Sequence, residues 1–369
     1  MSDKLIYRFL TAFVVFCAFS ISARADSPDS LSQIKMPPGF SIKIFAKAPG
    51  ARSIAVSPQL NAVFVGSIND SVIAISFKDG LAGSTWHLKG GLKVPHGVAW
   101  REGFLYVGEQ HRISRYRGDS IEALVKAKPE IIYDDLTDSA WHGRRDLAFG
   151  PDGKLYVAVG TPCNICMPEG NQGTILRMDP DGGNVSIFAH GIRNSVGLDF
   201  HPKTAVLHFT DNGADQMGDD IPPEELNHAP NAGLHFGYPY FGGGDSRTSK
   251  FKKETPPANA VQPVVLFGAH VAPLGLHFYR GSQFPKEMQH DAFVAQHGSW
   301  NRTIPDGYRI ARVRFDENGE ALSWEPFAEG WLQGPRSWGR PADVSELPDG
   351  SLLVSDDRQG VIYRIVYTP

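Results

Sequence analysis

A short hairpin pattern recurs through most of this chain and constrains its fold more than any other feature. Each copy has a hydrophobic pair, a turn built on Pro-Asp-Gly or a similar sequence, and a second hydrophobic strand. The clearest copies are LAFGPDGKLYVAVG (residues 147–160) and VSELPDGSLLVSDD (residues 344–357). Pro and Gly or Asp supply the φ angles of a tight turn, so each copy predicts two antiparallel strands. A lone hairpin cannot bury its apolar faces, whereas hairpins stacked around an axis can.

Four looser copies extend the pattern. They are IAVSPQLNAVFVG (54–66), GVAWREGFLYVGE (97–109), LDFHPKTAVLHFTD (198–211) and LHFYRGSQFPKEMQHDAFVAQ (276–296). The copies begin roughly 45 to 80 residues apart, which is the range expected of propeller blades that carry loop insertions. The repeats therefore predict an all-β fold, a six-bladed β-propeller, without a substantial helical domain.

The first 25 residues have the pattern of a secretory signal peptide. Lys4 and Arg8 precede an apolar run over residues 9–21, which ends at the sequence ARA. The run is shorter than the ~20 residues that a membrane span needs, and a small-x-small cleavage site follows it. We therefore predict a signal peptide over residues 1–25, a single propeller domain over residues 26–369, a periplasmic or secreted location and no stable membrane anchor.

The charge of the chain excludes some classes of partner. Its net charge is −4, and no block of like charge occurs in the sequence. Nucleic acids and anionic membranes are bound by clusters of basic residues, so neither is an expected partner.

Two of the three cysteines lie close together. Cys163 and Cys166 stand in TPCNICMPEG, whereas Cys17 falls within the predicted signal peptide. In an oxidising compartment, a disulfide that closes this small loop is the leading interpretation. A c-type haem site needs His after the second Cys, and Met167 stands there. A catalytic redox pair stays open as an alternative, although such pairs normally begin a helix and this one follows a predicted strand.

Polar clusters stand directly before or after the predicted strands. They are WHGRRD (141–146), HGIRN (190–194), TDNGAD (210–215) and GRPAD (339–343). Taken singly, each is more often a turn or a hydrogen-bonded loop than a catalytic group. Loops on one face of a propeller converge around its central channel, so clusters at equivalent strand ends can share one pocket. Their imidazole, guanidinium and amide groups suit an anionic, carbonyl-bearing ligand, and exposed backbone carbonyls suit Ca²⁺.

These motifs resemble those of the soluble quinoprotein glucose/sorbosone dehydrogenases, six-bladed propellers that use pyrroloquinoline quinone (PQQ) and Ca²⁺. The resemblance runs from PPGFSIKIFA (37–46) to GVIYRI (360–365). It implies that His142, in HGRRDLAFGPDGKLYVAVG, is the general base. It also implies that Arg193 and Asn194, in HGIRNSVGLDFHP, face the substrate and the quinone.

The resemblance further assigns cofactor and metal residues. The sequence DNGAD, followed by DDIPPEELN, resembles the calcium loop, in which the carbonyls of Gly213 and Ala214 hold the ion and Asn212 adjoins the cofactor. Arg340 matches an arginine that binds a PQQ carboxylate. The segment HVAP (270–273) resembles one that flanks the cofactor, with His270 at a polar contact.

The chain departs from the family pattern at several positions. Trp141 stands where glucose-oxidising members carry an acid, and Ala342 replaces a second PQQ-binding arginine. The expected cofactor lysine is missing from QHGSWNR (296–302), where Arg302 and His297 are possible substitutes. A glutamine expected from an early blade is also missing, and only His96 lies near that region. HGRRD and CNIC place the chain closer to the sorbosone-type branch than to the glucose branch.

The implied activity is the oxidation of an aldose or a sugar aldehyde to a lactone or acid. His142 accepts the hydroxyl proton, hydride moves to the quinone, and Arg193 and Ca²⁺ stabilise the charge that develops on it. Reduced PQQ then passes electrons to a separate acceptor, a cytochrome or a quinone. Two other classes stay open: a calcium-dependent propeller lactonase or other hydrolase, and a non-catalytic secreted binding module.

Overall fold

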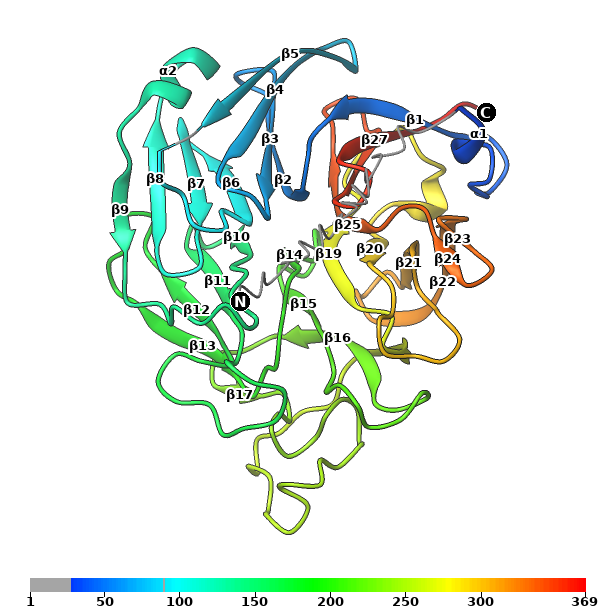
Figure 1. Cartoon of the computed structure of the whole chain (residues 1–369). Coiled ribbons are helices and arrows are strands. Elements are labelled where there is room, and N and C mark those ends of the chain that lie inside the picture. Colours follow the sequence, from blue (N-terminus) through cyan, green and yellow to red (C-terminus); the bar gives the residue numbers. More distant parts are fainter. Residues whose placement is uncertain (1–27, 89) are drawn as a thin grey trace, which may run out of the picture.

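The computed structural model describes residues 28–88 and 90–369, which form six antiparallel blades around one axis (Figure 1). The innermost strand of each blade contacts those of its two neighbours, and these contacts return to the first blade. The predicted six-bladed β-propeller is therefore confirmed. The predicted signal peptide, residues 1–25, lies outside the described residues. Within the described residues, no helix has both the length and the apolar character needed to cross a membrane.

The strands of each blade are given from the axis outward. Blade 1 has β2 (Ala51–Ser57), β3 (Ala62–Ser67), β4 (Val72–Lys78) and β5 (Leu81–Leu88). Blade 2 has β6 (Gly97–Arg101), β7 (Phe104–Gly108), β8 (Ile113–Arg117) and β9 (Glu130–Tyr133). Blade 3 has β10 (Leu147–Phe149), β11 (Leu155–Val159), β12 (Thr174–Met178) and β13 (Ser186–His190).

Blades 4 to 6 follow the same plan. Blade 4 has β14 (Leu198–Phe200), β15 (Leu207–Asp211), β16 (Pro223–Ala229) and β18 (Val265–Ala269). Blade 5 has β19 (Pro273–Phe278), β20 (Ala292–Gln296), β21 (Arg309–Phe315) and β22 (Ala321–Glu329). Blade 6 has β25 (Pro341–Glu346), β26 (Leu352–Asp356), β27 (Val361–Tyr367) and β1 (Phe40–Lys47).

A few short elements lie outside this plan. They are β17 (Leu234–His235), which pairs in parallel with β13, the hairpin β23 (Leu332–Gln333) and β24 (Arg336–Ser337), and the helices α1 (Pro28–Leu31), α2 (Ile121–Lys126) and η1 (Lys286–Met288).

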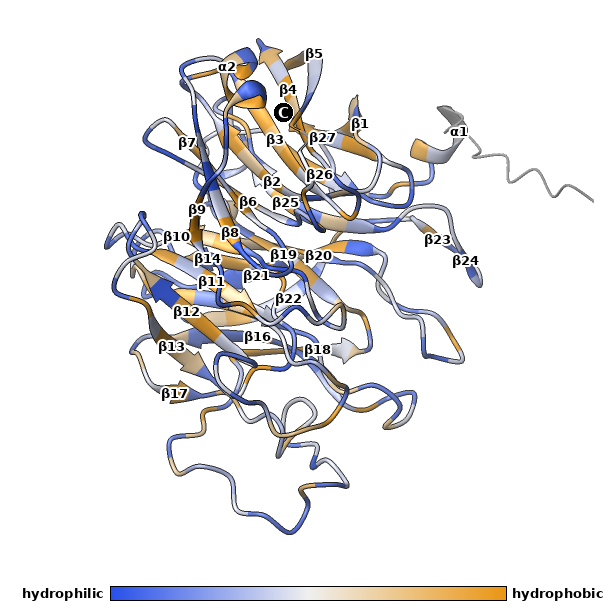
Figure 2. Ribbon diagram, turned by 60° about the vertical axis from the view of Figure 1, so that its left-hand side comes forward, coloured by the Kyte–Doolittle hydropathy of each residue, from blue (hydrophilic) through white to orange (hydrophobic). Residues whose placement is uncertain are grey.

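Each repeat found in the sequence forms the two inner strands of one blade. In blade 3, Leu147 of β10 pairs with Val157 of β11. The intervening turn closes at Gly153, whose φ of +76° is a conformation that glycine adopts without steric cost. The second strands, such as β3, β11 and β26, are buried along their whole length, whereas the outer strand β5 is mostly exposed. Figure 2 shows that many strands are hydrophobic and that the loops joining them are more hydrophilic.

The ring closes through a pair of strands from opposite ends of the chain. β1 adds to the outer edge of β27, with Phe40 opposite Tyr367 (Figure 1). Phe40 also packs edge-on against Phe284 and Phe327, at centroid distances of 4.8 and 5.0 Å. Blade 6 is therefore built from both ends of the described chain, and its apolar contacts with blade 5 fasten the ring.

Buried carboxylates join neighbouring blades near the axis. The carboxylate of Asp146 accepts a hydrogen bond from the Leu198 amide at 3.0 Å. The Asp199 side chain likewise accepts a hydrogen bond from the Phe278 amide, and the Asp343 side chain accepts one from the Ile54 amide, each at 2.7 Å. Each bond fixes one inner strand against the next, so the loops at the ends of these strands have a defined separation.

The alternation of strand directions sorts the loops onto two faces of the ring. Each inner strand begins, and each second strand ends, on the same face, because the two are antiparallel neighbours. We call this the channel face. It carries all four polar clusters identified in the sequence.

Candidate active site

His142 lies on the channel face, shortly before β10. Its Nδ1 is 2.9 Å from the carbonyl oxygen of Thr161. A carbonyl can only accept, so Nδ1 carries the proton and the lone pair is on Nε2. Burial, with the positive charge of Arg193, lowers the pKa of His142 to about 2, so the imidazole is neutral at physiological pH. A Cβ at Gly160 would lie 2.6 Å from the Cβ of His142, so this close approach requires glycine.

Trp141 stands beside this histidine and is 52% exposed. Its ring meets the His142 ring edge-on, with centroids 5.8 Å apart. Its backbone N–H donates to the Ser139 hydroxyl at 3.2 Å. An exposed indole held next to an imidazole is a flat apolar surface that suits the C–H face of a sugar ring.

Arg193 lies at the entry to blade 4 and is almost fully buried. Its guanidinium donates to the Asn164 carbonyl at 3.1 Å, the Asn164 side-chain oxygen at 2.9 Å, and the Asn212 carbonyl at 3.0 Å. It also pairs with the Asp215 carboxylate at 2.7 Å. Its charge is therefore held in a fixed position by protein groups.

Asn194 and Asn212 adjoin this arginine. The carboxylate of Asp211 accepts from the backbone N–H groups of Arg193 and Asn194, at 2.9 and 2.6 Å. The Asn212 amide donates to the carbonyls of Asn194 and Pro273, at 3.0 Å each. The Asn194 side-chain amide has no hydrogen-bond partner among the described residues, so it is free to contact a ligand.

The predicted calcium loop is held in place by hydrogen bonds from its backbone N–H groups. The Gly213 N–H donates to the Glu224 carboxylate and the Ala214 N–H donates to the Gly242 carbonyl, each at 2.6 Å. No group in the described part of the chain donates to the carbonyl oxygens of Gly213 or Ala214. These two oxygens are therefore available to a hard cation. A Cβ at position 213 would lie 2.8 Å from the Gly242 carbonyl oxygen, so the loop needs glycine there.

Buried acids lie around this loop. Burial raises the pKa of Glu224 to about 8 and also raises the pKa values of Asp211 and Glu225. Across residues 28–88 and 90–369, no group of three or more His, Cys, Asp or Glu side chains is placed to hold a metal ion. A cation at this loop would therefore depend on backbone carbonyls and on a ligand, as the resemblance implies.

A second group of residues on the channel face carries surplus positive charge. We define the cation cluster as Arg52, Arg144, Arg340, His297 and Asp357, contributed by blades 1, 3, 5 and 6. Arg52 and the Nε2 of His297 both contact the Asp357 carboxylate, at 2.6 and 2.9 Å. Arg340 donates to the backbone carbonyls of His297 and Gly298, at 3.1 and 2.9 Å. Arg144 and Arg340 interact electrostatically with Asp357 but form no ion pair with it among the described residues, so positive charge exceeds negative charge in the cation cluster.

Unpartnered donors in the cation cluster show that its hydrogen bonding is incomplete. Within residues 28–88 and 90–369, the buried Nε atoms of Arg52 and Arg144 have no hydrogen-bond partner, and neither has the nearby Nδ1 of His96. Arg144 has no hydrogen-bond or ion-pair partner among the described residues. The charge of Arg52, together with burial, lowers the pKa of Arg144 to about 10. An anion with several carboxylates would supply the missing acceptors, so these residues fit PQQ.

His270 and Arg302 occupy a different part of the channel face. His270 Nε2 lies 2.7 Å from the Gly218 carbonyl oxygen. Arg302 donates to the Asp219 carbonyl at 2.7 Å and to the Asp220 carboxylate at 3.2 Å. Both side chains brace the loop between β15 and β16. Arg302 also donates to the Ile304 carbonyl at 3.1 Å, so its guanidinium is bound by protein groups, unlike that of Arg144.

The structure thus brings the predicted residues together in two groups. His142, Arg193, Asn194, Asn212, Gly213 and Ala214 form one group, and Arg340 lies in the cation cluster. The sequence reasoning did not assign a role to Arg52, Arg144 or Asp357. Arg52 stands at the start of β2, and most of the named polar clusters also stand where a strand begins. This shared position is the sequence feature that could have identified Arg52 as a site residue.

The predicted disulfide between Cys163 and Cys166 is present. It closes a loop that follows β11 on the channel face. The Tyr238 hydroxyl accepts from the Cys166 N–H at 2.9 Å, which ties this loop to the segment after β17.

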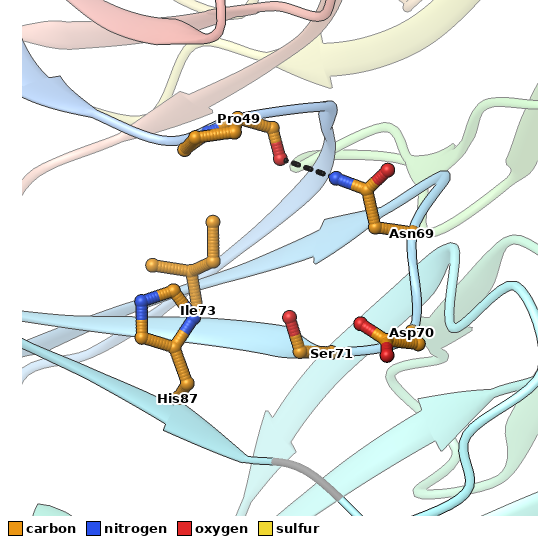
Figure 3. A pocket seen from close by; sticks show the side chains of 6 residues that line it. All are labelled: Pro49, Asn69, Asp70, Ser71, Ile73 and His87. Atoms are coloured by element: carbon orange, nitrogen blue, oxygen red, sulfur yellow. Dashed lines mark hydrogen bonds between the residues drawn. The ribbon is translucent and has the colours of Figure 1, made fainter.

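Two hollows accompany these groups. A shallow pocket on blade 1 is lined by Pro49, Asn69, Asp70, Ser71, Ile73 and His87 (Figure 3). It contains none of the cation-cluster residues. A small cavity lies beside the predicted calcium loop, lined by Arg193, Asp211, Gly213, Glu225 and aromatic and glycine residues from 236–243.

Comparisons with known proteins agree with this fold. The family model described as Glucose / Sorbosone dehydrogenase matches residues 107–364. An uncharacterized protein of Borreliella burgdorferi is 32% identical over 367 residues, which cover 96% of this chain and 95% of that protein. A pyrroloquinoline quinone-dependent pyranose dehydrogenase of Coprinopsis cinerea is 40% identical over 127 residues, 29% of this chain and 17% of that protein. A calcium structure of Trichoderma reesei Carbohydrate-Active Enzymes Family AA12 has a TM-score of 0.77 and 19% identity, covering 91% of this chain and 97% of that chain.

Proposed function

This chain belongs to the glucose/sorbosone dehydrogenase family, and we propose that it is a quinoprotein that oxidises an aldose or a sugar aldehyde to a lactone or an acid. The proposal assigns PQQ and Ca²⁺ as its cofactors. The observation that carries it is the cation cluster, in which Arg52, Arg144 and Arg340 lie close enough to interact electrostatically with Asp357, while among the described residues only Arg52 of the three forms an ion pair with it. Buried charge of one sign needs a counter-charge, and PQQ is a tricarboxylate.

The cation cluster would hold the carboxylates of PQQ. In the described part of the chain, Arg144 and the Nε of Arg52 have donors without a partner, and Arg340 is oriented by two backbone carbonyls. Guanidinium binds carboxylate bidentately, which lysine cannot do. Arg52 and Arg144 therefore take the places of the lysine and the second arginine that this chain lacks.

His142 would remove the substrate's hydroxyl proton through Nε2. The Thr161 carbonyl holds the proton on Nδ1, so the basic lone pair is on the other nitrogen. The low pKa of the ligand-free imidazole arises mainly from burial and then from Arg193. An anionic ligand nearby opposes that effect of charge and raises the basicity of His142. PQQ, when bound with Ca²⁺, supplies the two-electron acceptor.

The residues near blade 4 would orient the cofactor and the metal. The carbonyls of Gly213 and Ala214 would bind Ca²⁺, and the free amide of Asn194 would contact the ligand. Arg193 would place a fixed positive charge beside His142, where negative charge develops. Trp141 would stack on the substrate's apolar face, in the place where glucose-oxidising relatives carry an acid.

The remaining parts of the proposal follow from the sequence. The predicted signal peptide supports a periplasmic or secreted enzyme. HGRRD and CNIC support the sorbosone-type branch and a sorbosone-like sugar aldehyde as substrate. A cytochrome or a quinone would accept the electrons.

Reconstitution tests the proposal. Purified apoprotein is titrated with PQQ in the presence of Ca²⁺, and the quinone absorbance and dye-linked oxidation of aldoses and sugar aldehydes are followed. We expect saturable binding and sugar-dependent dye reduction, both lost with EGTA. Lactone hydrolysis without PQQ would instead identify a hydrolase. Absence of PQQ binding and of both activities would indicate a binding module.

A further inference from the structure

The disulfide loop makes most of its polar contacts through one residue. Cys163 and Cys166 enclose only Asn164 and Ile165. The Tyr238 hydroxyl lies 3.3 Å from the Asn164 carbonyl oxygen and accepts from the Cys166 N–H at 2.9 Å. The disulfide joins the two ends of the loop, and the Tyr238 hydroxyl holds Cys166 and Asn164, so the position of Asn164 is defined.

Both polar atoms of the Asn164 side chain form hydrogen bonds with residues of the candidate active site. Its Oδ1 accepts from Arg193 Nη2 and from the Asp215 N–H, at 2.9 Å each. Its Nδ2 donates to the Asp215 carbonyl at 3.0 Å. The Asn164 backbone carbonyl accepts from Arg193 Nε at 3.1 Å. Asn164 therefore binds the guanidinium and both backbone groups of the residue that follows the calcium loop.

These contacts close a three-residue network. Arg193 also pairs with the Asp215 carboxylate at 2.7 Å, so Asn164, Arg193 and Asp215 each contact the other two. Asp215 directly follows Gly213 and Ala214, and Arg193 donates to the carbonyl of Asn212 at 3.0 Å. The segment 212–215 is thus held from both ends, and an amide that donates and accepts on one neighbour fixes that neighbour's orientation.

We infer that Asn164, held by the Cys163–Cys166 disulfide, is a positioning residue that fixes the Arg193 guanidinium against segment 212–215 and so sets the affinity of that segment for Ca²⁺. The calcium part of this inference rests on the proposed function. The positioning part rests on the network alone. A catalytic role for the cysteines is not needed, because the disulfide acts through Asn164.

Hydrogen exchange of apoprotein tests the positioning without any cofactor. The Asp215 N–H donates to Asn164 Oδ1, so Asn164→Ala should make this amide exchange at least tenfold faster. Asn164→Asp keeps an acceptor oxygen and should restore much of the protection. Ile165→Ala is the matched control within the same loop and should exchange as the wild type does. Wild-type protection of Asp215 in Asn164→Ala would overturn the inference.

Reduction tests the contribution of the disulfide. Excess dithiothreitol transfers two electrons and two protons in two exchanges, so Cys163 and Cys166 become thiols and the reagent closes to a cyclic disulfide. We expect reduced wild-type protein, with unchanged circular dichroism, to show the faster Asp215 exchange. This measurement also replaces Asn164→Ala if that variant does not fold. Unchanged exchange after reduction would show that the disulfide does not position Asn164.

Calcium titration tests the functional consequence. We expect the Kd for Ca²⁺ to rise at least tenfold in Asn164→Ala and in reduced protein, and to stay unchanged in Ile165→Ala. Coupling is reciprocal, so a tenfold effect means that saturating Ca²⁺ shifts the midpoint potential of the disulfide by about 30 mV. If oxidised wild-type protein binds no Ca²⁺, the calcium assignment of the proposed function fails, while the exchange data still decide the positioning. Equal Ca²⁺ affinity in all variants would refute the coupling.

Discussion

The two sides of the channel face differ in how completely their arginine side chains are hydrogen-bonded. Near blade 4, Arg193 is bound by Asn164, Asn212 and Asp215 through four contacts. In the cation cluster, Arg144 has no partner among the described residues, and its pKa is lowered by the charge of Arg52 and by burial. Both are arginines with little exposure at strand entries of the same fold.

This difference in pairing distinguishes an arginine that stabilises the fold from one that is placed to bind a ligand. A paired guanidinium contributes to the stability of the folded chain, because its removal leaves buried acceptors without a donor. An unpaired guanidinium among like charges costs stability and is useful only when a ligand neutralises it. We therefore assign ligand binding to Arg144 and its neighbours, and fixed orientation to Arg193.

The largest expected effect concerns His142, which stands between the two sides. His142→Ala should lower the turnover of holoenzyme by about 10²- to 10⁴-fold and leave PQQ affinity nearly unchanged, as expected for loss of one general base. Steady-state rates per bound PQQ measure this. His228→Ala, in β16, is the control and should keep wild-type turnover. A His142→Ala enzyme with normal turnover would remove the histidine from the mechanism.

The next effect compares the two arginines directly. Arg193→Met removes the ion pair with Asp215 and the charged donor to Asn164, and it should lower the unfolding free energy of apoprotein by about 3 kcal/mol. Arg144→Met removes an unpaired charge and should not lower it. Urea unfolding of both apoproteins measures the difference. Equal losses would mean that Arg144 also has a structural role and would break the comparison.

The fold was predictable because its information is local. The six hairpins carry their turn residues and their alternating hydrophobic positions within a short stretch of sequence, as residues 147–160 illustrate. The outer strands gave weaker signals, because strands such as β5 are mostly exposed and lack a regular apolar pattern. Ring closure by β1 and β27 joins opposite ends of the chain, and a pairing at that separation has no local signature.

The candidate site was predictable only in part, for a similar reason. His142, Arg193 and Asn212 lie in motifs that the resemblance identifies. The incomplete pairing of Arg144 is a property of three dimensions, since it depends on what Arg52, Arg340 and Asp357 contribute from other blades. The same holds for Arg302, whose bonds to the loop at residues 219–220 could not be inferred from its place in QHGSWNR.

A smaller effect tests which arginine binds PQQ. Arg144→Met should weaken PQQ binding by about 10- to 100-fold, the value of a hydrogen bond between charged groups. Arg144→Lys should recover part of this loss, because lysine keeps the charge without the bidentate geometry. Arg302→Met is the comparison variant and should bind PQQ nearly as the wild type does. Fluorescence titration measures the PQQ affinity of all three variants. If Arg302→Met weakens PQQ binding more than Arg144→Met does, Arg302 is the residue that contacts the cofactor.

The smallest effect is a pH dependence that arises in the cation cluster. His297 donates from Nε2 to Asp357, and burial, with the charges of Arg52 and Arg340, lowers its pKa to about 4. The unfolded value is about 6.5, so His297 contributes stability that is present above pH 6.5 and is lost as the pH falls towards 4. His297→Gln keeps a donor but cannot titrate. Apoprotein should therefore lose about 1 kcal/mol more in wild type than in His297→Gln between pH 7.5 and pH 5.5.

The same measurement on holoprotein sharpens the comparison of the two sides. If PQQ binds at the cation cluster as proposed, it places negative charge beside His297 and raises the pKa of this histidine, so the His297-dependent loss of stability should shrink when the cofactor is present. His208, in β15, provides the contrast: burial lowers its pKa to about 3, and the charged groups that act on it are His228, His201 and Asp199. The loss of unfolding free energy at low pH that His208→Phe removes should be the same with and without PQQ.

Urea unfolding at pH 7.5 and pH 5.5, with and without the cofactor, measures these differences in unfolding free energy. If PQQ changes the contribution of His208 as much as that of His297, the cofactor does not bind at the cation cluster.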